Sequence, residues 1–278
     1  LMNIIYQLIN CLFIIFQFSL LLKVGLNNNK KIALITGATS GIGEATAILL
    51  SNYCSLIICG RRKDKLEKLE KSLSKKTNIL SLCFDVRDKK VIKDKIQGLT
   101  NDWKCIDILV NNAGNAHGFD LIHEGNLEDW DAMIDINVKG LLYVTKSVVP
   151  LMVKRKSGII INIGSIAGKE VYTKGNVYCA SKFAVDAISK GMRLDLNNFN
   201  IKVTSINPGL VETEFSMVRF KNNIDKARNV YKGMQPLKAN DVAEIIDFII
   251  KRPDNICISD ISILPKSQAS STVVKRSD

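Results

Sequence analysis

Two residues four positions apart suggest acid–base chemistry. Tyr178 and Lys182 lie in the stretch Asn-Val-Tyr-Cys-Ala-Ser-Lys, which is typical of the start of a helix. This spacing places both side chains on one helical face, about one turn apart. A tyrosine with its usual pKa of about 10 is a poor proton donor or acceptor at neutral pH, and a nearby ammonium group lowers that pKa. The pair therefore predicts a tyrosine that exchanges protons with a substrate, although surface helices often carry the same spacing by chance.

A glycine-rich turn near the start of the chain predicts a phosphate site. The apolar run Lys31–Thr36 is expected to be a buried strand, and an amphipathic helix is expected from Glu44 to Leu50. Gly37-Ala-Thr-Ser-Gly-Ile-Gly43 joins them, which is the context that a dinucleotide-binding loop requires. Glycine allows the backbone to approach a pyrophosphate, and the helix N-terminus offers free N–H groups. The residues expected to hold the dinucleotide here are Gly37, Thr39, Ser40, Gly41, Ile42 and Gly43.

Ordered motifs along the chain resemble those of the short-chain dehydrogenase/reductase family. They are Thr36-Gly37-x-x-x-Gly41-Ile42-Gly43, Asn111-Asn112-Ala113-Gly114, Ser165, Tyr178-x-x-x-Lys182 and Asn207-Pro208-Gly209. The similarity extends from about Lys30 to about Gln268. It implies an oxidoreductase that acts on CH–OH groups with a nicotinamide cofactor.

The alternation of apolar segments and amphipathic helices predicts an α/β fold. The expected strands are Lys31–Thr36, Ser55–Cys59, Ile79–Asp85, Ile106–Asn111, Gly158–Ile163, Ile201–Asn207 and Ile256–Leu264. Such alternation implies a Rossmann-type, doubly wound parallel sheet of about seven strands, with right-handed crossovers and helices on both faces. Ligands of such sheets bind at the carboxyl ends of the strands. We expect a single domain over residues 30–266.

The family resemblance also implies roles for four catalytic residues. Ser165 would hydrogen-bond the substrate oxygen, and Tyr178 would deliver a proton to that oxygen or remove it. Lys182 would lower the pKa of the tyrosine and bind the nicotinamide ribose. Asn137 would hold a water in a proton relay to Lys182. The hydride belongs to the nicotinamide, so the protein positions and polarises the substrate.

The end of the second expected strand favours NADP over NAD. An NAD-binding protein is expected to carry Asp or Glu there, whereas this chain has Arg61 and Arg62, whose guanidinium groups suit a 2′-phosphate. The alternative interpretation is a basic first turn of the expected helix Lys63–Ser74. By resemblance, the remaining cofactor contacts are Asp85 and Val86 at the adenine, Asn112, Ala113 and Gly114 under the adenosine, and Pro208, Gly209, Val211 and Thr213 around the nicotinamide carboxamide.

The segment after Pro208 indicates a substrate class. Gly-Leu-Val-Glu-Thr-Glu-Phe-Ser-Met-Val-Arg-Phe220, followed by an expected helix Asn222–Gly233, resembles the branch of NADP-dependent serine and 3-hydroxypropionate dehydrogenases. Such acids carry a carboxylate, and we expect Arg219 to contact it; the alternative is a surface arginine on a mobile lid. Other functions remain open: a 3-oxoacyl-thioester reductase, a membrane-tethered lipid, retinoid or steroid reductase, and a non-catalytic NADP sensor.

Both ends of the chain are expected to lie outside the fold. Residues 1–22 carry no charge and are long enough to cross a bilayer, so membrane association would depend on this leader alone. The leader, residues 1–29, is interpreted as an anchor or a mis-assigned start, and less readily as a targeting peptide. Basic residues follow it, which would put the domain in the cytoplasm. The polar tail, residues 267–278, is expected to be mobile.

Composition argues against several other classes. The net charge is +12, but the lysines alternate with glutamates along expected helices, which indicates solvated faces rather than a nucleic-acid site. Two histidines in one loop predict no metal site, and seven scattered cysteines fit a reducing compartment. By resemblance, the helices Leu127–Val153 and Val177–Asn197 would pair between subunits in a dimer or tetramer.

Overall fold

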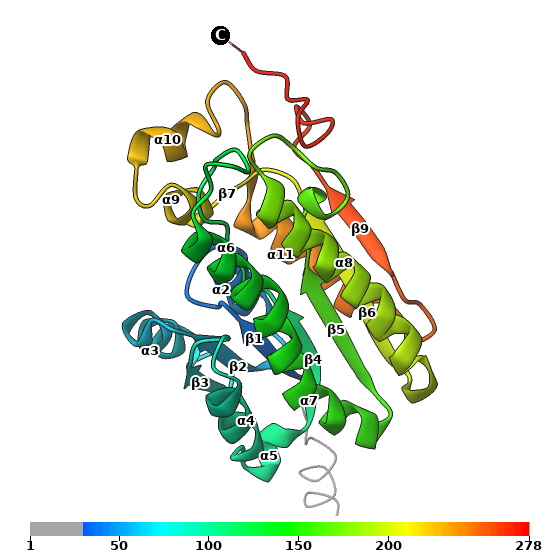
Figure 1. Ribbon diagram of the computed structural model, residues 1–278. Helices are drawn as coiled ribbons and strands as arrows, with labels where there is room; N and C mark the ends of the chain where they lie inside the picture. The colour runs from blue at the N-terminus through cyan, green and yellow to red at the C-terminus, as the bar shows by residue number, and fades with distance from the viewer. Residues whose placement is uncertain (1–29, 278) are drawn as a thin grey trace, which may run out of the picture. The chain divides into compact units, whose positions relative to one another are not determined.

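A parallel sheet of seven strands forms the centre of the domain (Figure 1). This computed structural model describes residues 30–277, so the predicted leader at 1–29 lies outside the described residues. The strand order is β3-β2-β1-β4-β5-β6-β9, and all neighbours are parallel. The strands are β1 (Ile32–Thr36), β2 (Ser55–Gly60), β3 (Ile79–Cys83), β4 (Ile106–Asn111), β5 (Gly158–Ile163), β6 (Ile201–Pro208) and β9 (Asp260–Ile263). The predicted fold class is confirmed, and the order reverses between β1 and β4, where such sheets bind ligands.

Two layers of helices cover the two faces of the sheet (Figure 1). One layer contains α4 (Lys89–Gln97), α7 (Leu141–Arg155) and α8 (Asn176–Leu196), and the other contains α2 (Gly41–Leu50), α3 (Lys63–Leu73) and α11 (Ala239–Ile250). Successive side chains of a strand point to opposite faces. Thus Leu34 packs in the first core cluster and its neighbour Ile35 in the second. Both faces are buried, which explains the continuous apolar runs in the sequence.

Some elements differ from the prediction. The long helix expected from Leu127 is α6 (Leu127–Ile134), a π-helical turn η1 (Asp135–Gly140) and α7. The last expected strand, Ile256–Leu264, is shortened to β9, because the Ile256 N–H closes a turn onto the Pro253 carbonyl. The remaining short helices are α5 (Asn101–Lys104), η2 (Ile166–Gly168) and η3 (Asn197–Phe199).

The segment after β6 is less helical than predicted. The expected helix Asn222–Gly233 is only α10 (Ile224–Asn229), since Asn222 and Gly233 adopt positive φ values of 66° and 71° that interrupt a helix. A further short helix, α9 (Phe215–Arg219), precedes it. The strands β7 (Val211–Glu212) and β8 (Leu237–Lys238) pair in a small separate sheet. We call residues 213–220 the lid segment.

The C-terminal residues fold back onto the domain, whereas a mobile tail was expected from residue 267. Gln268 is buried and forms an isolated bridge with Val274. The Ser277 N–H donates to the Gly233 carbonyl. This segment therefore joins the wall around the carboxyl ends of the strands.

The stretch Leu127–Arg155 is long and apolar enough to cross a membrane by length and composition. In the structure, however, its buried residues Val144 and Val148 pack in the core beside the sheet.

Candidate active site

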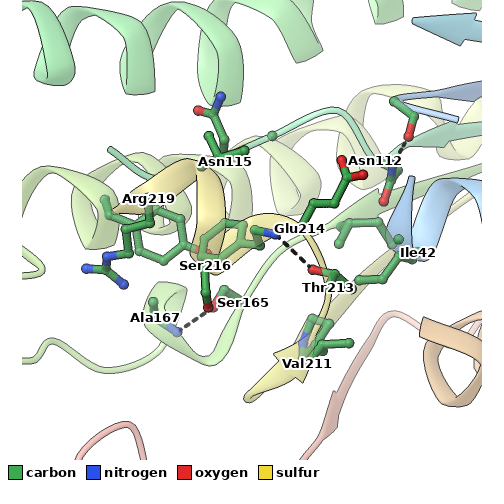
Figure 2. A pocket seen from close by; sticks show the side chains of 18 of the residues that line it. Ile42, Asn112, Asn115, Ser165, Ala167, Val211, Thr213, Glu214, Ser216 and Arg219 are labelled. Carbon is green, nitrogen blue, oxygen red and sulfur yellow. Dashed lines mark hydrogen bonds between the residues drawn. The ribbon is translucent and has the colours of Figure 1, made fainter. Parts of the chain in front are cut away.

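A cavity of about 710 Å³ opens at the carboxyl ends of the strands (Figure 2). It is lined by the loops that follow β1, β2, β3, β4, β5 and β6, together with the lid segment and part of the C-terminal segment. Nearly all the predicted site residues lie in this lining. The two exceptions are Gly43 and Asn137, which lie directly behind it.

The glycine turn has the geometry of a phosphate cradle. Gly37 and Gly41 adopt positive φ values of 64° and 56°, where other residues are strained. A Cβ on Gly43 would lie 2.4 Å from the Gly37 carbonyl oxygen, so only glycine fits there. The hydroxyl of Ser40, the residue before α2, accepts a bond from Arg62 rather than capping the helix. The first N–H groups of α2 are therefore available to an anion, and this cradle fits a dinucleotide.

The loop after β4 fixes this turn in place. The Thr36 hydroxyl donates to the Val110 carbonyl and accepts from the backbone N–H groups of Asn112 and Ala113. The Asn112 side-chain amide donates to the carbonyls of Thr36 and Gly37. Asn112, predicted as a cofactor contact, thus also holds the glycine turn in shape.

Tyr178 and Lys182 lie together as the helical spacing predicts, but the cavity changes their electrostatics. The Lys182 ammonium lies 6.0 Å from the Tyr178 ring centroid and donates to the Ile163 carbonyl at 3.0 Å. Burial lowers the pKa of Lys182 to about 8. Burial also raises the pKa of Tyr178 above its usual value of 10, and outweighs the opposing effects of the Ser165 hydroxyl and Arg219. The expected lowering of the tyrosine pKa therefore does not occur in this state, and the Tyr178 hydroxyl keeps its proton at neutral pH.

Asn137 lies in the π-helical turn, behind the cavity. Its Nδ2 donates to the Asn115 carbonyl and to the Ser181 hydroxyl, and its Oδ1 accepts from the Asn115 N–H. A Cβ on Gly114 would lie 3.2 Å from Asn137 Oδ1 and 3.5 Å from Lys182 Nζ, so glycine leaves the space between them open. With these bonds made, Asn137 can bind the predicted water only through a remaining lone pair of its Oδ1.

Asn115 is not among the cofactor contacts predicted from the sequence, which in this loop end at Gly114. It lines the cavity, and its buried Oδ1 has no hydrogen-bond partner among residues 30–277. An unpaired buried acceptor is costly, so this atom is a candidate contact for a bound molecule.

The two adjacent arginines have different surroundings. Arg62 donates to the Thr39 hydroxyl at 3.0 Å and to the Ser40 hydroxyl at 2.8 Å, so its side chain is held against the glycine turn. Arg61 is more exposed and lies 3.5 Å from the Asp85 carboxylate. Burial raises the pKa of Asp85, but hydrogen bonds from Arg87 and the charges of Arg87 and Arg61 lower it overall. Asp85 therefore remains ionised at neutral pH.

Arg219 lines the cavity (Figure 2) and lies next to Tyr178. Its Nε donates to the Gly118 carbonyl and its Nη1 donates to the Tyr172 hydroxyl at 2.9 Å. The guanidinium carbon lies 4.7 Å from the Phe119 ring centroid and 5.6 Å from the Tyr178 ring centroid. This half-buried cation is thus held next to the tyrosine rather than on the surface.

Aromatic side chains around the cavity carry no periodic signal in the sequence. Phe119 and Tyr172 come from loops, and Phe215 packs edge-on against Tyr178 at 5.6 Å between ring centroids. The sequence does not predict the positions of these aromatic side chains, because the positions depend on how the loops fold together.

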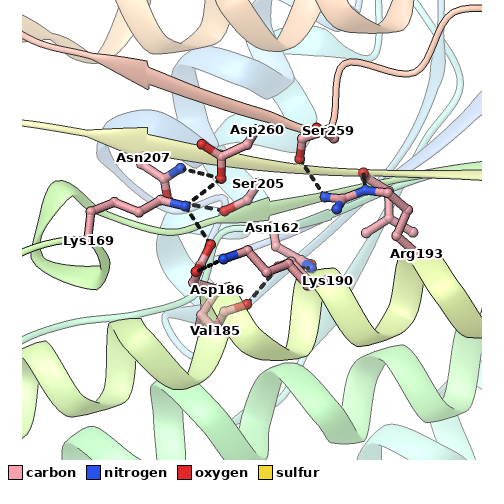
Figure 3. A network of polar contacts seen from close by, with 12 residues as sticks. Asn162, Lys169, Val185, Asp186, Lys190, Arg193, Ser205, Asn207, Ser259 and Asp260 are labelled. Carbon is pink, nitrogen blue, oxygen red and sulfur yellow. Dashed lines mark hydrogen bonds and ion pairs between the residues drawn. The ribbon is translucent and has the colours of Figure 1, made fainter.

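A polar network fixes the turn after Ser165 to its neighbours (Figure 3). Lys169, directly after η2, pairs with Asp186 of α8 at 2.6 Å and with Asp260 of β9 at 2.7 Å. Asn207 Nδ2 donates to the same Asp260 carboxylate. Burial lowers the pKa of Lys169, but the hydrogen bonds and charges of the two aspartates raise it overall. Lys169 thus stays charged and links three elements behind the cavity.

A comparison of sequences decides the family. The profile described as short chain dehydrogenase matches residues 31–224. The chain belongs to this short-chain dehydrogenase family. The match includes the glycine turn, Ser165, Tyr178 and Lys182, so the predicted resemblance is confirmed.

Curated relatives of this short-chain dehydrogenase are similar over nearly their whole length. A "NADP-dependent 3-hydroxy acid dehydrogenase" of Schizosaccharomyces pombe is 40% identical over 250 residues, which cover 88% of this chain and 96% of the relative. A "Serine 3-dehydrogenase" of Rhizobium radiobacter is 40% identical over 237 residues, covering 85% and 94%. A solved structure, "The Closed form of serine dehydrogenase complexed with NADP+", is 40% identical with a TM-score of 0.83, and the match covers 89% of this chain and 100% of that one.

Proposed function

We propose that this protein is an NADP-dependent dehydrogenase that transfers a hydride between nicotinamide and a small 3-hydroxy acid. The observation that carries the proposal is the cation Arg219, held 5.6 Å from the ring of the proton-donating Tyr178. A 3-hydroxy acid has a carboxylate two carbons from the reacting hydroxyl carbon. The relatives with 3-hydroxy acid and serine dehydrogenase activities support the same class. NADP is the cofactor, in line with the relatives and with the two arginines after β2.

The residues at the cavity divide the work between proton transfer and orientation. When bound, NADP supplies or accepts the hydride. The Ser165 hydroxyl orients the substrate oxygen, and Tyr178 donates its proton to that oxygen during reduction. Lys182, buried with one backbone partner at Ile163, has two further N–H groups for ribose hydroxyls. The N–H groups at the start of α2 hold the pyrophosphate.

We further propose that Arg219 binds the substrate carboxylate. Its Nε and Nη1 are engaged by Gly118 and Tyr172, which fixes the orientation of the guanidinium group. Nη2 makes no hydrogen bond to any residue of the described chain and remains for a carboxylate oxygen. The rings of Phe119 and Tyr172 lie next to the guanidinium and shield it in part from water, which strengthens a charge-assisted hydrogen bond.

Turnover of candidate substrates tests the function directly. Purified protein is given L-serine, 3-hydroxypropionate, 3-hydroxyisobutyrate or an acetoacetyl thioester, with NADP(H) or NAD(H), while nicotinamide absorbance is followed. We expect turnover of the free acids with NADP, and loss of turnover in Tyr178→Phe without loss of NADP binding. Turnover of the thioester alone would replace the proposal with fatty-acid synthesis.

A pair of substrates matched in size but not in charge tests Arg219. Arg219→Met should raise the KM for 3-hydroxypropionate by roughly 10- to 100-fold, since a hydrogen bond to a charged group contributes about 1.5–3 kcal/mol. The KM for the neutral 3-hydroxypropionamide should stay the same. Arg228→Met on the exposed side of α10 is the control. Equal effects of Arg219→Met on acid and amide would contradict the carboxylate contact.

We also propose a cytoplasmic homo-oligomer that forms through α7 and α8. These helices carry exposed apolar side chains, among them Leu142 on α7 and Phe183 and Leu194 on α8. Light scattering of the purified protein at several concentrations measures the subunit number, and a monomer throughout would contradict this proposal.

A further inference from the structure

Two cations beside the adenosine end of the cavity hold an anion that belongs to the protein itself. Arg62 Nη1 pairs with one oxygen of Glu214 at 2.7 Å, and Lys65 Nζ pairs with the other at 2.6 Å. The same guanidinium donates to the Ser40 hydroxyl at 2.8 Å. Arg62 and Lys65 are therefore arranged around an anionic group, and we call them the cation cluster.

Glu214 reaches this cluster from a remote part of the chain. It lies near the start of the lid segment, 152 positions after Arg62, and the cavity lining includes both residues. Its neighbour Thr213 packs where a Cβ on Gly41 would lie, at 3.1 Å. The Glu214 carboxylate thus extends from the lid segment to the side of the cavity where the glycine turn lies.

The Glu214 carboxylate is ionised at neutral pH. Burial raises the pKa of Glu214, but the hydrogen bonds and charges of Lys65 and Arg62 lower it to about 2. Both partners in the pair are partly exposed, so solvent ions and ligands can compete for it.

We propose that Glu214 occupies the position of the 2′-phosphate of NADP, that Lys65 joins Arg62 in holding this phosphate, and that the phosphate displaces Glu214 when the cofactor binds. This rests on the proposed NADP dependence. A phosphate monoester, like a carboxylate, offers several anionic oxygens to a guanidinium and an ammonium group. The Glu214 carboxylate and the 2′-phosphate are both anions and repel each other, so only one of them occupies the cation cluster at a time.

The displacement makes Glu214 and Lys65 determinants of cofactor choice. NAD has only a ribose hydroxyl at this position and does not neutralise the two cations, so Glu214 stays in place. NADP replaces Glu214 and thereby frees the lid segment from α3. Arg61 is a weaker candidate for the same role, because Asp85 lies beside it and it makes no contact with Glu214.

Binding of cofactor fragments tests the proposal without any turnover. Calorimetry with the full chain compares adenosine 2′,5′-bisphosphate with 5′-AMP, which lacks the 2′-phosphate. Glu214→Gln should bind the bisphosphate about 5- to 10-fold more tightly, since a competing charge is removed, and Lys65→Met should bind it about tenfold more weakly. Affinity for 5′-AMP should change less than about twofold in both variants.

Glu212→Gln is the matched control. It removes the same charge two residues earlier, where the carboxylate pairs with Lys238 outside the cavity lining. This variant should bind both fragments as the wild type does. In wild type, hydrogen exchange of the amides in the lid segment should become faster with the bisphosphate and stay the same with 5′-AMP.

The outcomes separate this inference from the proposed function. A wild type that does not prefer the bisphosphate over 5′-AMP would overturn the NADP dependence and the inference together. A wild type that prefers it, with no tightening in Glu214→Gln, would overturn the displacement alone. Equal weakening of both fragments in Lys65→Met would show that Lys65 does not contact the 2′-phosphate.

Discussion

Replacing Lys182 by methionine should stabilise the folded protein at neutral pH although it removes a residue of the proposed active site. The reason is that burial lowers the pKa of this lysine from 10.5 to about 8, so its charged form is disfavoured in the fold. Below pH 8 the lysine is protonated in both the folded and the unfolded chain, and the folded state bears the full cost of the buried charge. Between pH 8 and 10.5 the folded state releases the proton first, so stability rises with pH.

The expected effect follows from these two pKa values. Each pH unit between them corresponds to about 1.4 kcal/mol, so at about pH 6.5 the cost is roughly 3 kcal/mol. At about pH 9.5 Lys182 is largely deprotonated in the folded protein, and a cost of roughly 1 kcal/mol remains. The free energy of unfolding of Lys182→Met should therefore exceed that of wild type by an amount that shrinks by about 2 kcal/mol over this range. The lost bond to the Ile163 carbonyl and altered packing add an offset that does not depend on pH.

Urea unfolding of the cofactor-free protein, followed by circular dichroism at several pH values, measures this difference. Lys146→Met, on the exposed side of α7, removes the same charge without burial and should show a small offset that does not vary with pH. A stability difference between wild type and Lys182→Met that stays constant from about pH 6.5 to 9.5 would refute the assignment of a buried, destabilising ammonium group.

Two further variants test the supports of the site. Gly43→Ala should weaken NADP binding in fluorescence titrations by roughly 10- to 100-fold, because its Cβ would displace the Gly37 carbonyl and the phosphate cradle. Gly191→Ala in α8, where a Cβ meets no atom within 4 Å outside its own helix, should bind NADP normally; equal losses in both would contradict the steric argument. Lys169→Met should lower kcat by roughly 10- to 100-fold with NADP affinity unchanged, because the turn after Ser165 loses its links to Asp186 and Asp260, and Lys169→Arg should restore part of kcat. A lower NADP affinity with normal kcat would show that Lys169 does not position Ser165.

Local features of the sequence predicted the frame of the site. The strands β4 and β5 begin and end where the apolar runs do, because a strand buried on both faces needs a continuous apolar segment. The spacing of Tyr178 and Lys182 determined their shared helical face, since a helical turn is a local property. Glycines 37, 41 and 43 predicted the turn, because their backbone conformation or crowding admits no side chain.

Features that depend on solvent exclusion were not predictable in this way. The spacing alone suggested a tyrosine with a lowered pKa, but the pKa of Tyr178 is raised because α8, the lid segment and the loop with Tyr172 bury it together. In the same way, the polar composition of residues 267–278 suggested mobility, whereas Gln268 is buried and accepts a hydrogen bond from the Leu210 N–H.

The sequence by itself therefore determined the family, the parallel sheet and the shared helical face of Tyr178 and Lys182, because these depend on short-range patterns of residue type. Only the tertiary structure decided that Glu214 meets Arg62 and Lys65, and that Arg219 lies over the Tyr178 ring. These pairs come from segments that are far apart in the chain, and their energies depend on distance and burial in space. No local pattern records such contacts, so they arise only when the sheet brings the ends of its strands to one edge.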